Sequence, residues 1–117
     1  MSDSYCPKRG DVVWLTFTPQ AGHEQAGHRP ALVLSPESYN EKIGLALVCP
    51  ITTQAKGYSF EVRIPEGVEV RGVVLVDHVK SLDWKARKAR FCCAMPAATM
   101  SEVLGKLAPL IGEPTTL

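Results

Sequence analysis

The residues that could do chemistry gather between positions 22 and 30, which read Gly-His-Glu-Gln-Ala-Gly-His-Arg-Pro. An acid, an amide, two imidazoles and an arginine precede the apolar run at 31–34. Binding and catalytic groups often lie on loops that a rigid scaffold holds in place. An Ala26-Gly27 elbow separates Glu24 from Arg29, so the carboxylate and the guanidinium could face one phosphate between them. The two side chains could equally form a surface ion pair, a contact that contributes little stability.

A second concentration of charge lies further along the chain. The net charge of +1 does not by itself indicate a polyanion partner, but five of the thirteen basic side chains fall within residues 80–90. Asp83 is the one acid among them, and the five are Lys80, Lys85, Arg87, Lys88 and Arg90. Such runs are usually a solvated face; the alternative is an electrostatic footprint for phosphates or for an acidic protein segment.

The cysteines and histidines do not predict a metal site or a cofactor. Cys6, Cys49, Cys92 and Cys93 contain no Cys-x-x-Cys pair, and the three histidines lack metal-ligand spacing. Neighbours at 92 and 93 should point to opposite faces of a strand. We interpret all four as reduced thiols of a cytoplasmic protein, since the chain also shows neither a secretory signal nor an apolar run long enough to span a membrane.

Strand patterns predominate among the elements that must position these groups. Residues 11–18 alternate, with Val13, Leu15 and Phe17 on one face and Val12, Trp14 and Thr16 on the other. The continuous apolar runs at 31–34 and 45–49 are typical of strands that are covered on both faces. Further strands are predicted over 60–64, 72–76, 79–84 and 89–94.

Two helices complete the predicted fold. Ser35 should cap a short helix that Gly44 closes. A C-terminal amphipathic helix should begin at the capping box Thr99-x-x-Glu102, or earlier at Pro96, and Pro109 should kink or end it. The expected fold is a single domain over 1–117, mainly β, in which a small barrel of five to seven strands carries the C-terminal helix.

Short motifs run in a fixed order along nearly the whole chain. They are Gly10-Asp11-x-x-Trp14, Glu24-Gln25-Ala26-Gly27-His28-Arg29-Pro30-Ala31, Val33-Leu34-Ser35-Pro36, Cys49-Pro50-Ile51-Thr52-Thr53-Gln54, Lys56-Gly57-Tyr58, Phe60-Glu61-Val62 and Asp77-His78-Val79-Lys80-Ser81. Together, from about Pro7 to Ile111, they resemble the MazF/PemK family of toxin endoribonucleases. The resemblance implies an SH3-like barrel that forms a homodimer and cleaves single-stranded RNA without metal. It also implies inhibition by a cognate antitoxin whose acidic, disordered tail wraps the toxin.

The resemblance also assigns chemical roles. Metal-free cleavage uses the RNA's own 2′-hydroxyl as the nucleophile and leaves a 2′,3′-cyclic phosphate and a 5′-hydroxyl. Glu24 can act as the base, Arg29 can stabilise the charge on the phosphorane, and Thr52 offers a hydroxyl donor. Asp77 is a weaker catalytic candidate, because the PemK-like branch pairs this aspartate with an arginine two residues earlier, where this chain has Leu75.

Five further residues are predicted to contact RNA: Phe17, His28, Gln54, Lys56 and Lys80. Phe17 could stack on a base or belong to the core, and His28 fits substrate contact better than catalysis. Two other functions remain open. One is a non-catalytic toxin of the CcdB-like sister group, which binds DNA gyrase; the other is a barrel that only binds RNA or protein. Neither would require Glu24, Arg29 and Thr52 together.

Overall fold

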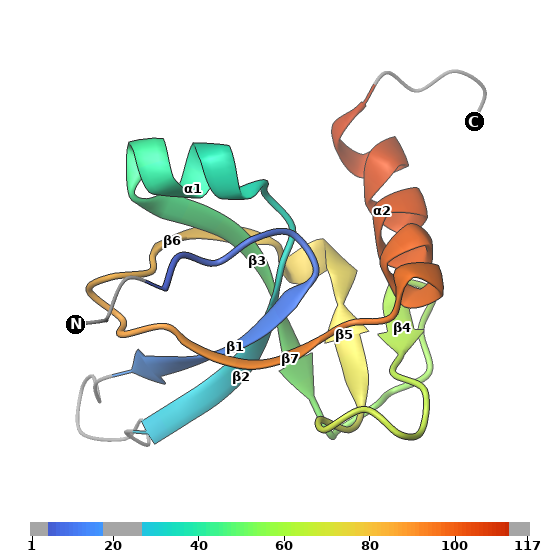
Figure 1. Cartoon of the computed structure of the whole chain (residues 1–117). Coiled ribbons are helices and arrows are strands. Elements are labelled where there is room, and N and C mark those ends of the chain that lie inside the picture. Colours follow the sequence, from blue (N-terminus) through green and yellow to red (C-terminus); the bar gives the residue numbers. More distant parts are fainter. Residues whose placement is uncertain (1–4, 18–26, 113–117) are drawn as a thin grey trace, which may run out of the picture.

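Short antiparallel strands form most of the regular secondary structure (Figure 1). The structure is a computed structural model that describes residues 5–17 and 27–112. In those ranges the elements are β1 (Asp11–Phe17), β2 (Gly27–Val33), α1 (Glu37–Ile43), β3 (Leu45–Thr52), β4 (Glu61–Arg63), β5 (Val73–Leu75), the 3₁₀ turn η1 (Val76–His78), β6 (Lys80–Asp83), β7 (Arg90–Ala94) and α2 (Ala97–Ile111). The expectation of a mainly β chain with a short helix and a C-terminal helix is confirmed.

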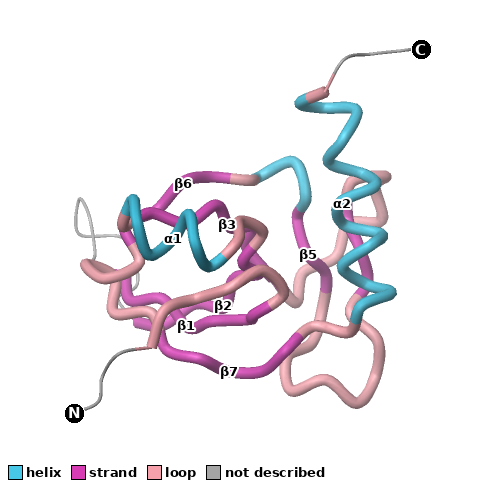
Figure 2. The backbone as a smooth tube through the Cα atoms, turned by 45° about the horizontal axis from the view of Figure 1, so that its top comes forward, coloured by secondary structure: helices cyan, strands magenta, loops and turns pink. Residues whose placement is uncertain are grey.

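Strand β3 is the centre of the sheet. The strand order is β4-β5-β3-β2-β1-β7, every pairing is antiparallel, and β6 adds to β3. The first half of β3 pairs with β6 and its last two residues pair with β5. Turn η1 lies between β5 and β6, so the chain bends there and follows β3 along its whole length. Figure 2 shows β5 and α2 together at one end of the molecule and α1 at the other.

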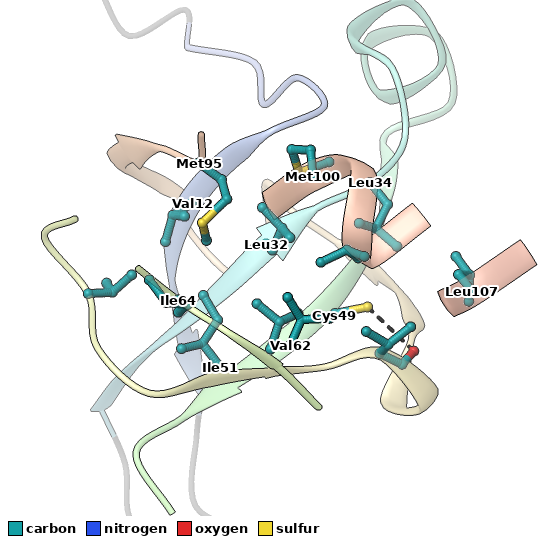
Figure 3. Close-up of a cluster of buried hydrophobic side chains, with 14 residues drawn as sticks. Val12, Leu32, Leu34, Cys49, Ile51, Val62, Ile64, Met95, Met100 and Leu107 are labelled. Atoms are coloured by element: carbon teal, nitrogen blue, oxygen red, sulfur yellow. Dashed lines mark hydrogen bonds between the residues drawn. The ribbon is translucent and has the colours of Figure 1, made fainter. Parts of the chain in front are cut away.

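The inner strands bury side chains on both faces, as their apolar runs predicted. One cluster, drawn in Figure 3, holds Val12, Leu32 and Cys49 of the strands together with Val103 of α2. The other face of the same strands buries a second cluster, which consists of Val13, Leu15, Ala31, Val33, Ala46, Val48 and Trp84. Each fully buried valine or leucine contributes about 1.5–3 kcal/mol, so the two clusters fix which face each residue of β1, β2 and β3 presents.

Helix α1 ends as predicted but begins differently. Gly44 adopts a left-handed conformation with φ of 84° and its N–H donates to the Asn40 carbonyl. The prediction that Ser35 caps the helix is wrong, because Pro36 occupies the cap position without a side-chain hydrogen bond. The Ser35 hydroxyl instead donates to the buried Asn40 side chain and accepts from the Leu47 N–H. Ser35 therefore joins α1 to β3.

Helix α2 follows the alternative of an earlier start. It begins at Ala97 with Pro96 at the cap position, and Thr99 is buried instead of capping. Pro109 does not end the helix, since Gly112 N–H donates to the Ala108 carbonyl in the turn that follows. The helix packs against β4 and η1. No helix in the described ranges is long and apolar enough to cross a membrane.

Gly72 allows β5 to approach β3 closely. Its φ is +110°, and a Cβ atom added there would lie 2.0 Å from the carbonyl oxygen of Thr52. A side chain at this position would push β5 away from the end of β3. The absence of a side chain at residue 72 therefore sets the position of Thr52.

We predict that Gly72→Ala destabilises the fold more than Gly44→Ala does. Both substitutions place a side chain in a left-handed conformation, which costs about 1–3 kcal/mol. Gly44 has open space where the Cβ would go, whereas Gly72 meets the Thr52 backbone. Urea denaturation of the two variants measures the difference. Equal losses of stability would contradict the close approach.

Candidate functional site

Pairing between β2 and β3 brings Arg29 and Thr52 together. The register pairs Val33 with Val48 and Ala31 with Pro50. Extending it by two residues places Arg29 directly opposite Thr52, and opposed residues of an antiparallel pair point to the same face. The backbone pairing stops at Ala31 and Pro50, so the strands separate where these two side chains lie.

A hollow of about 590 Å³ lies at this point, lined mainly by residues of β2, β3 and β6. Its apolar floor continues the second core cluster through Leu15, Ala31, Val48 and Leu82. Its polar lining is basic apart from one hydroxyl, and consists of Arg29, Thr52, His78, Lys80 and Arg87. No carboxylate of the described residues lines it. Such a lining attracts an anion.

A second hollow adjoins the first. It shares Arg29, Pro30, Ile51 and Thr52 with the first, so these four residues form the ridge between the two. Beyond the ridge it is lined by Trp14, His28, Thr53, Gln54, Glu69, Val70 and Arg71. The two hollows thus make one groove across the ends of β2 and β3, with cations in both hollows and with aromatic, amide and acidic side chains in the second.

Both ridge side chains have donors to offer a ligand. Thr52 Oγ1 accepts a hydrogen bond from the Gln54 N–H at 3.1 Å, so its own hydrogen is left to donate elsewhere. Arg29 is exposed, and its side chain has no hydrogen bond or ion pair with any residue of the described part of the chain. A guanidinium and a hydroxyl on one ridge can hold the oxygens of one phosphate.

His28 and Arg29 were predicted to lie in a loop, and this is wrong. Both lie in β2, where His28 pairs with Thr16 of β1 and Arg29 with Leu15. Residues 27–30 carry no apolar alternation, but pairing with β1 overrides that weak local preference. The His28 ring Nδ1 lies 3.4 Å from the Thr16 hydroxyl. A strand therefore fixes the Arg29 backbone more firmly than a loop would.

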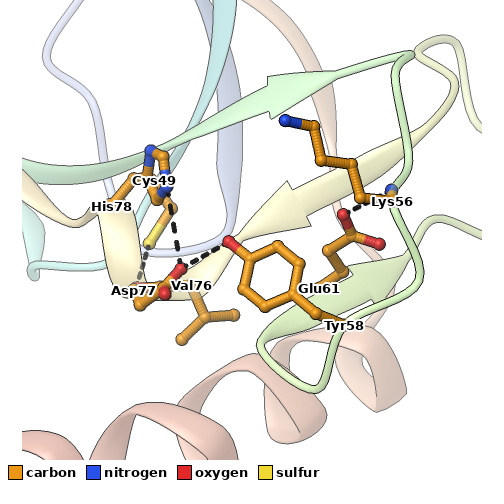
Figure 4. A network of polar contacts seen from close by, with 7 residues as sticks. All are labelled: Cys49, Lys56, Tyr58, Glu61, Val76, Asp77 and His78. Carbon is orange, nitrogen blue, oxygen red and sulfur yellow. Dashed lines mark hydrogen bonds and ion pairs between the residues drawn. The ribbon is translucent and has the colours of Figure 1, made fainter.

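Asp77 and Lys56 lie outside both hollows. The Tyr58 hydroxyl donates to Asp77 Oδ1 at 2.8 Å, and the His78 ring lies 3.9 Å from the same oxygen (Figure 4). This hydrogen bond raises the pKa of Tyr58, because it stabilises the protonated phenol. Backbone N–H groups of Lys56 and Gly57 donate to the Glu61 carboxylate, which holds their loop. Asp77 thus lines neither hollow, although its neighbour His78 lines the first, and its catalytic role stays a prediction.

Two of the predicted residues cannot be placed. Glu24 lies outside the described residues, and although Phe17 ends β1, its side chain also lies outside them. Their roles as base and as stacking surface stay predictions. Gln54 and Lys80 do line the groove, together with His28.

The basic cluster at 80–90 divides between two surfaces. Lys80 and Arg87 line the first hollow, whereas Lys85, Lys88 and Arg90 border a separate depression around Trp84. Lys85 Nζ lies 5.5 Å from the centre of the Trp84 ring. Sequence reasoning gave no site role to Trp14, Arg71 or His78. His78 could have been found from its motif, where it stands two residues before Lys80.

The prediction that Cys92 and Cys93 point to opposite faces is wrong. Val12 pairs with Cys93 and Val13 with Phe91, so β7 carries one extra residue, Cys92, at a bulge. The bulge breaks the alternation, and the two sulfurs lie 3.6 Å apart. With Glu69 they form a group whose ligand atoms lie within 4.8 Å of one another, which the spacing of the cysteines did not predict.

Fold and groove together define a small β-barrel protein with a groove whose first hollow is cationic. Residues 8–111 match the family described as PemK-like, MazF-like toxin of type II toxin-antitoxin system. The chain belongs to this family.

Individual relatives agree with this assignment. The chain is 47% identical over 112 residues to the endoribonuclease toxin MazF of Escherichia coli K12, a match that covers 96% of this chain and 100% of the relative. It is 36% identical over 109 residues to the Escherichia coli endoribonuclease PemK, covering 89% of this chain and 81% of that one.

Solved structures also match. The MazE-MazF crystal structure (Form-II) from Deinococcus radiodurans gives a TM-score of 0.88 at 56% identity, covering 92% of this chain and 97% of that chain. The crystal structure of MazF (Form-I) from the same organism gives a TM-score of 0.83 at 55% identity, covering 94% of this chain and 100% of that chain. The expected fold class, a small MazF-like barrel with a C-terminal helix, is confirmed.

Proposed function

We propose that this chain cleaves single-stranded RNA at short sequence motifs through attack of the RNA's own 2′-hydroxyl, without a catalytic metal. The chain is an endoribonuclease toxin of a type II toxin–antitoxin system, as its relatives are. One observation carries the proposed chemistry: Arg29 and Thr52 lie together on the ridge of a groove whose first hollow holds only basic and neutral side chains among the described residues. Because the proposed substrate is messenger RNA, we place its action in the cytoplasm.

The proposed reaction starts with the scissile phosphate on the ridge. The 2′-hydroxyl attacks the adjacent phosphorus, the bond to the 5′ oxygen breaks, and a cyclic phosphate remains. Arg29 and Thr52 donate hydrogen bonds to the non-bridging oxygens, where negative charge increases in the transition state. Glu24 removes the proton of the 2′-hydroxyl. The leaving oxygen takes a proton, for which the groove offers the N–H groups of Arg29, His78 and Lys80.

The two sides of the groove suit the two parts of a nucleotide. The cationic side chains of Lys80 and Arg87 line the first hollow and can contact phosphates of the RNA backbone. Trp14, His28 and Gln54 line the second, where an unpaired base can stack or form hydrogen bonds. Phe17 and Lys56 stay predicted RNA contacts outside the two hollows' linings. Only an unpaired strand can present its bases in this way, which supports single-stranded RNA as the substrate.

We predict that Arg29→Ala lowers the cleavage rate by about 10²–10³, the usual loss when one donor to a developing oxyanion is removed. The control is Arg63→Ala, because Arg63 is an exposed arginine of β4 that lines neither hollow. Single-turnover cleavage of a short RNA, with circular dichroism to verify the fold, measures both variants. An Arg29→Ala enzyme that cuts as fast as Arg63→Ala would refute the assignment.

Replacing the ribose of the scissile nucleotide by 2′-deoxyribose should abolish cleavage and leave binding intact, because it removes only the nucleophile. The intramolecular hydroxyl is already beside the phosphorus, so cleavage of ordinary RNA should also survive EDTA. Gel analysis of the products checks both results. A cut deoxy substrate, or a 3′-hydroxyl product, would mean that water attacks instead. A gyrase-binding toxin would cut neither RNA.

We also assign two protein partners. A second copy of the chain is one, since the described residues expose large apolar side chains, among them Ile43 and Leu47. Two-fold pairing is the commonest way for an identical copy to cover such surface. The other is a cognate antitoxin with an acidic, disordered tail, which can wrap a large basic area. The Deinococcus radiodurans structure named MazE-MazF supports this partner.

The antitoxin tail and RNA should compete for the groove. Lys80→Glu reverses a charge in the first hollow and should weaken the binding of both ligands. Lys85→Glu reverses a charge beside Trp84 and should weaken their binding less. Fluorescence polarisation with an uncleavable oligonucleotide measures this, and both affinities should fall as salt rises. Independent binding of tail and RNA at saturation would disprove a shared groove.

A further inference from the structure

The bulge in β7 creates a pair of thiols that the proposed cleavage does not use. Cys92 and Cys93 both pack against the core cluster that contains Val12, although they are neighbours in the chain. Both are half-buried, and Cys92 Sγ lies 3.6 Å from Cys93 Sγ. Two sulfurs bound to one tetrahedral zinc ion lie about 3.8 Å apart, because each Zn–S bond is about 2.3 Å long. The spacing of these thiols therefore already suits a shared ion.

Glu69 supplies a third ligand from a different part of the chain. It lies on the segment between β4 and β5, and its carboxylate is exposed. The ligand atoms of Glu69, Cys92 and Cys93 all lie within 4.8 Å of one another.

The chemical types of the three ligands determine which metal ion the site prefers. Two thiolates exclude Mg²⁺ and Ca²⁺, which take oxygen ligands, while a carboxylate is a poor partner for Cu(I). Zn²⁺ accepts sulfur and carboxylate oxygen in one tetrahedral site. Zn²⁺ binds cysteine as the thiolate, so each sulfur gives up its proton on binding. Binding therefore releases two protons, and affinity should rise as the pH rises.

We propose that Glu69, Cys92 and Cys93 form a Zn²⁺ site that fastens the segment between β4 and β5 to strand β7. Water completes the tetrahedron at the exposed side. The ion binds beside the groove, since Glu69 also lines the second hollow with Thr52 and Gln54, and we assign it no part in cleavage. Its role is structural, and the proposal stands or falls independently of the cleavage mechanism.

Metal titration of the full chain tests the site. The protein is kept reduced with a phosphine and freed of metal, and Co²⁺ is added as a spectroscopic substitute for Zn²⁺. We expect one ion per chain, the near-ultraviolet charge-transfer band of cobalt bound to thiolate, and loss of that band when Zn²⁺ is added. Competition with a chromophoric chelator gives the Zn²⁺ affinity. No band at millimolar Co²⁺ would overturn the proposal.

Matched variants identify the ligands. Loss of a group that only supports a metal ligand lowers metal affinity about 10–100-fold, and loss of a ligand should cost at least as much. Cys92→Ser, Cys93→Ser and Glu69→Gln should therefore each lower the affinity for Zn²⁺ at least tenfold. Cys6→Ser and Glu66→Gln are the controls: Cys6 lies near Glu37 instead, and Glu66 lies on the same segment as Glu69 outside the cluster. Both controls should bind as the unaltered chain does.

Because Glu69 is exposed, Glu69→Gln should fold even if a serine variant does not, and it then tests the site. Unchanged Zn²⁺ affinity in Glu69→Gln, or loss of the cobalt band in Cys6→Ser, would overturn the site. RNA cleavage is not the readout of this experiment. Cleavage that survives EDTA while the chelator removes Zn²⁺ is the result that both proposals expect, and failure of either one leaves the other testable.

Discussion

The functional groove depends on the register between β2 and β3. This register pairs Ala31 with Pro50, and it therefore brings Arg29 to face Thr52 two residues further on. Because side chains alternate along a strand, a slip of one residue would turn Arg29 toward the opposite face. The burial of Ala31, Val33 and Val48 in one cluster holds the register, since a slip would exchange these side chains with those of the other face. Core packing thus positions the polar pair.

Other elements maintain this arrangement at its two ends. Gly72 lets β5 lie against the end of β3, where Thr52 is the last residue. Turn η1 then carries the chain from β5 to β6, so that His78 and Lys80 reach the same hollow as Thr52. Strand β6 continues this face, since Lys80 pairs with Val48. Residues that lie far apart in the sequence, on β2, β3, η1 and β6, therefore surround one site.

The alternation of apolar residues was enough to predict most of the strands, and the ordered motifs predicted the family and the Arg29–Thr52 pair. The start of β2 could not be predicted, because residues 27–30 become a strand only through pairing with β1. The bulge at Cys92 was also missed, since it depends on how β1 meets β7 and not on the local sequence. Both misses lie where long-range pairing overrides local pattern, and both lie beside the proposed sites.

A crystal structure of the chain with a short RNA, made uncleavable by one 2′-deoxyribose, tests the central claim most directly. The account predicts one phosphate within hydrogen-bond distance of both the Arg29 guanidinium and Thr52 Oγ1, with the backbone running past Lys80 and a base beside Trp14. Phosphates bound beside Lys85 and Arg90, with the Arg29–Thr52 ridge empty, would contradict it.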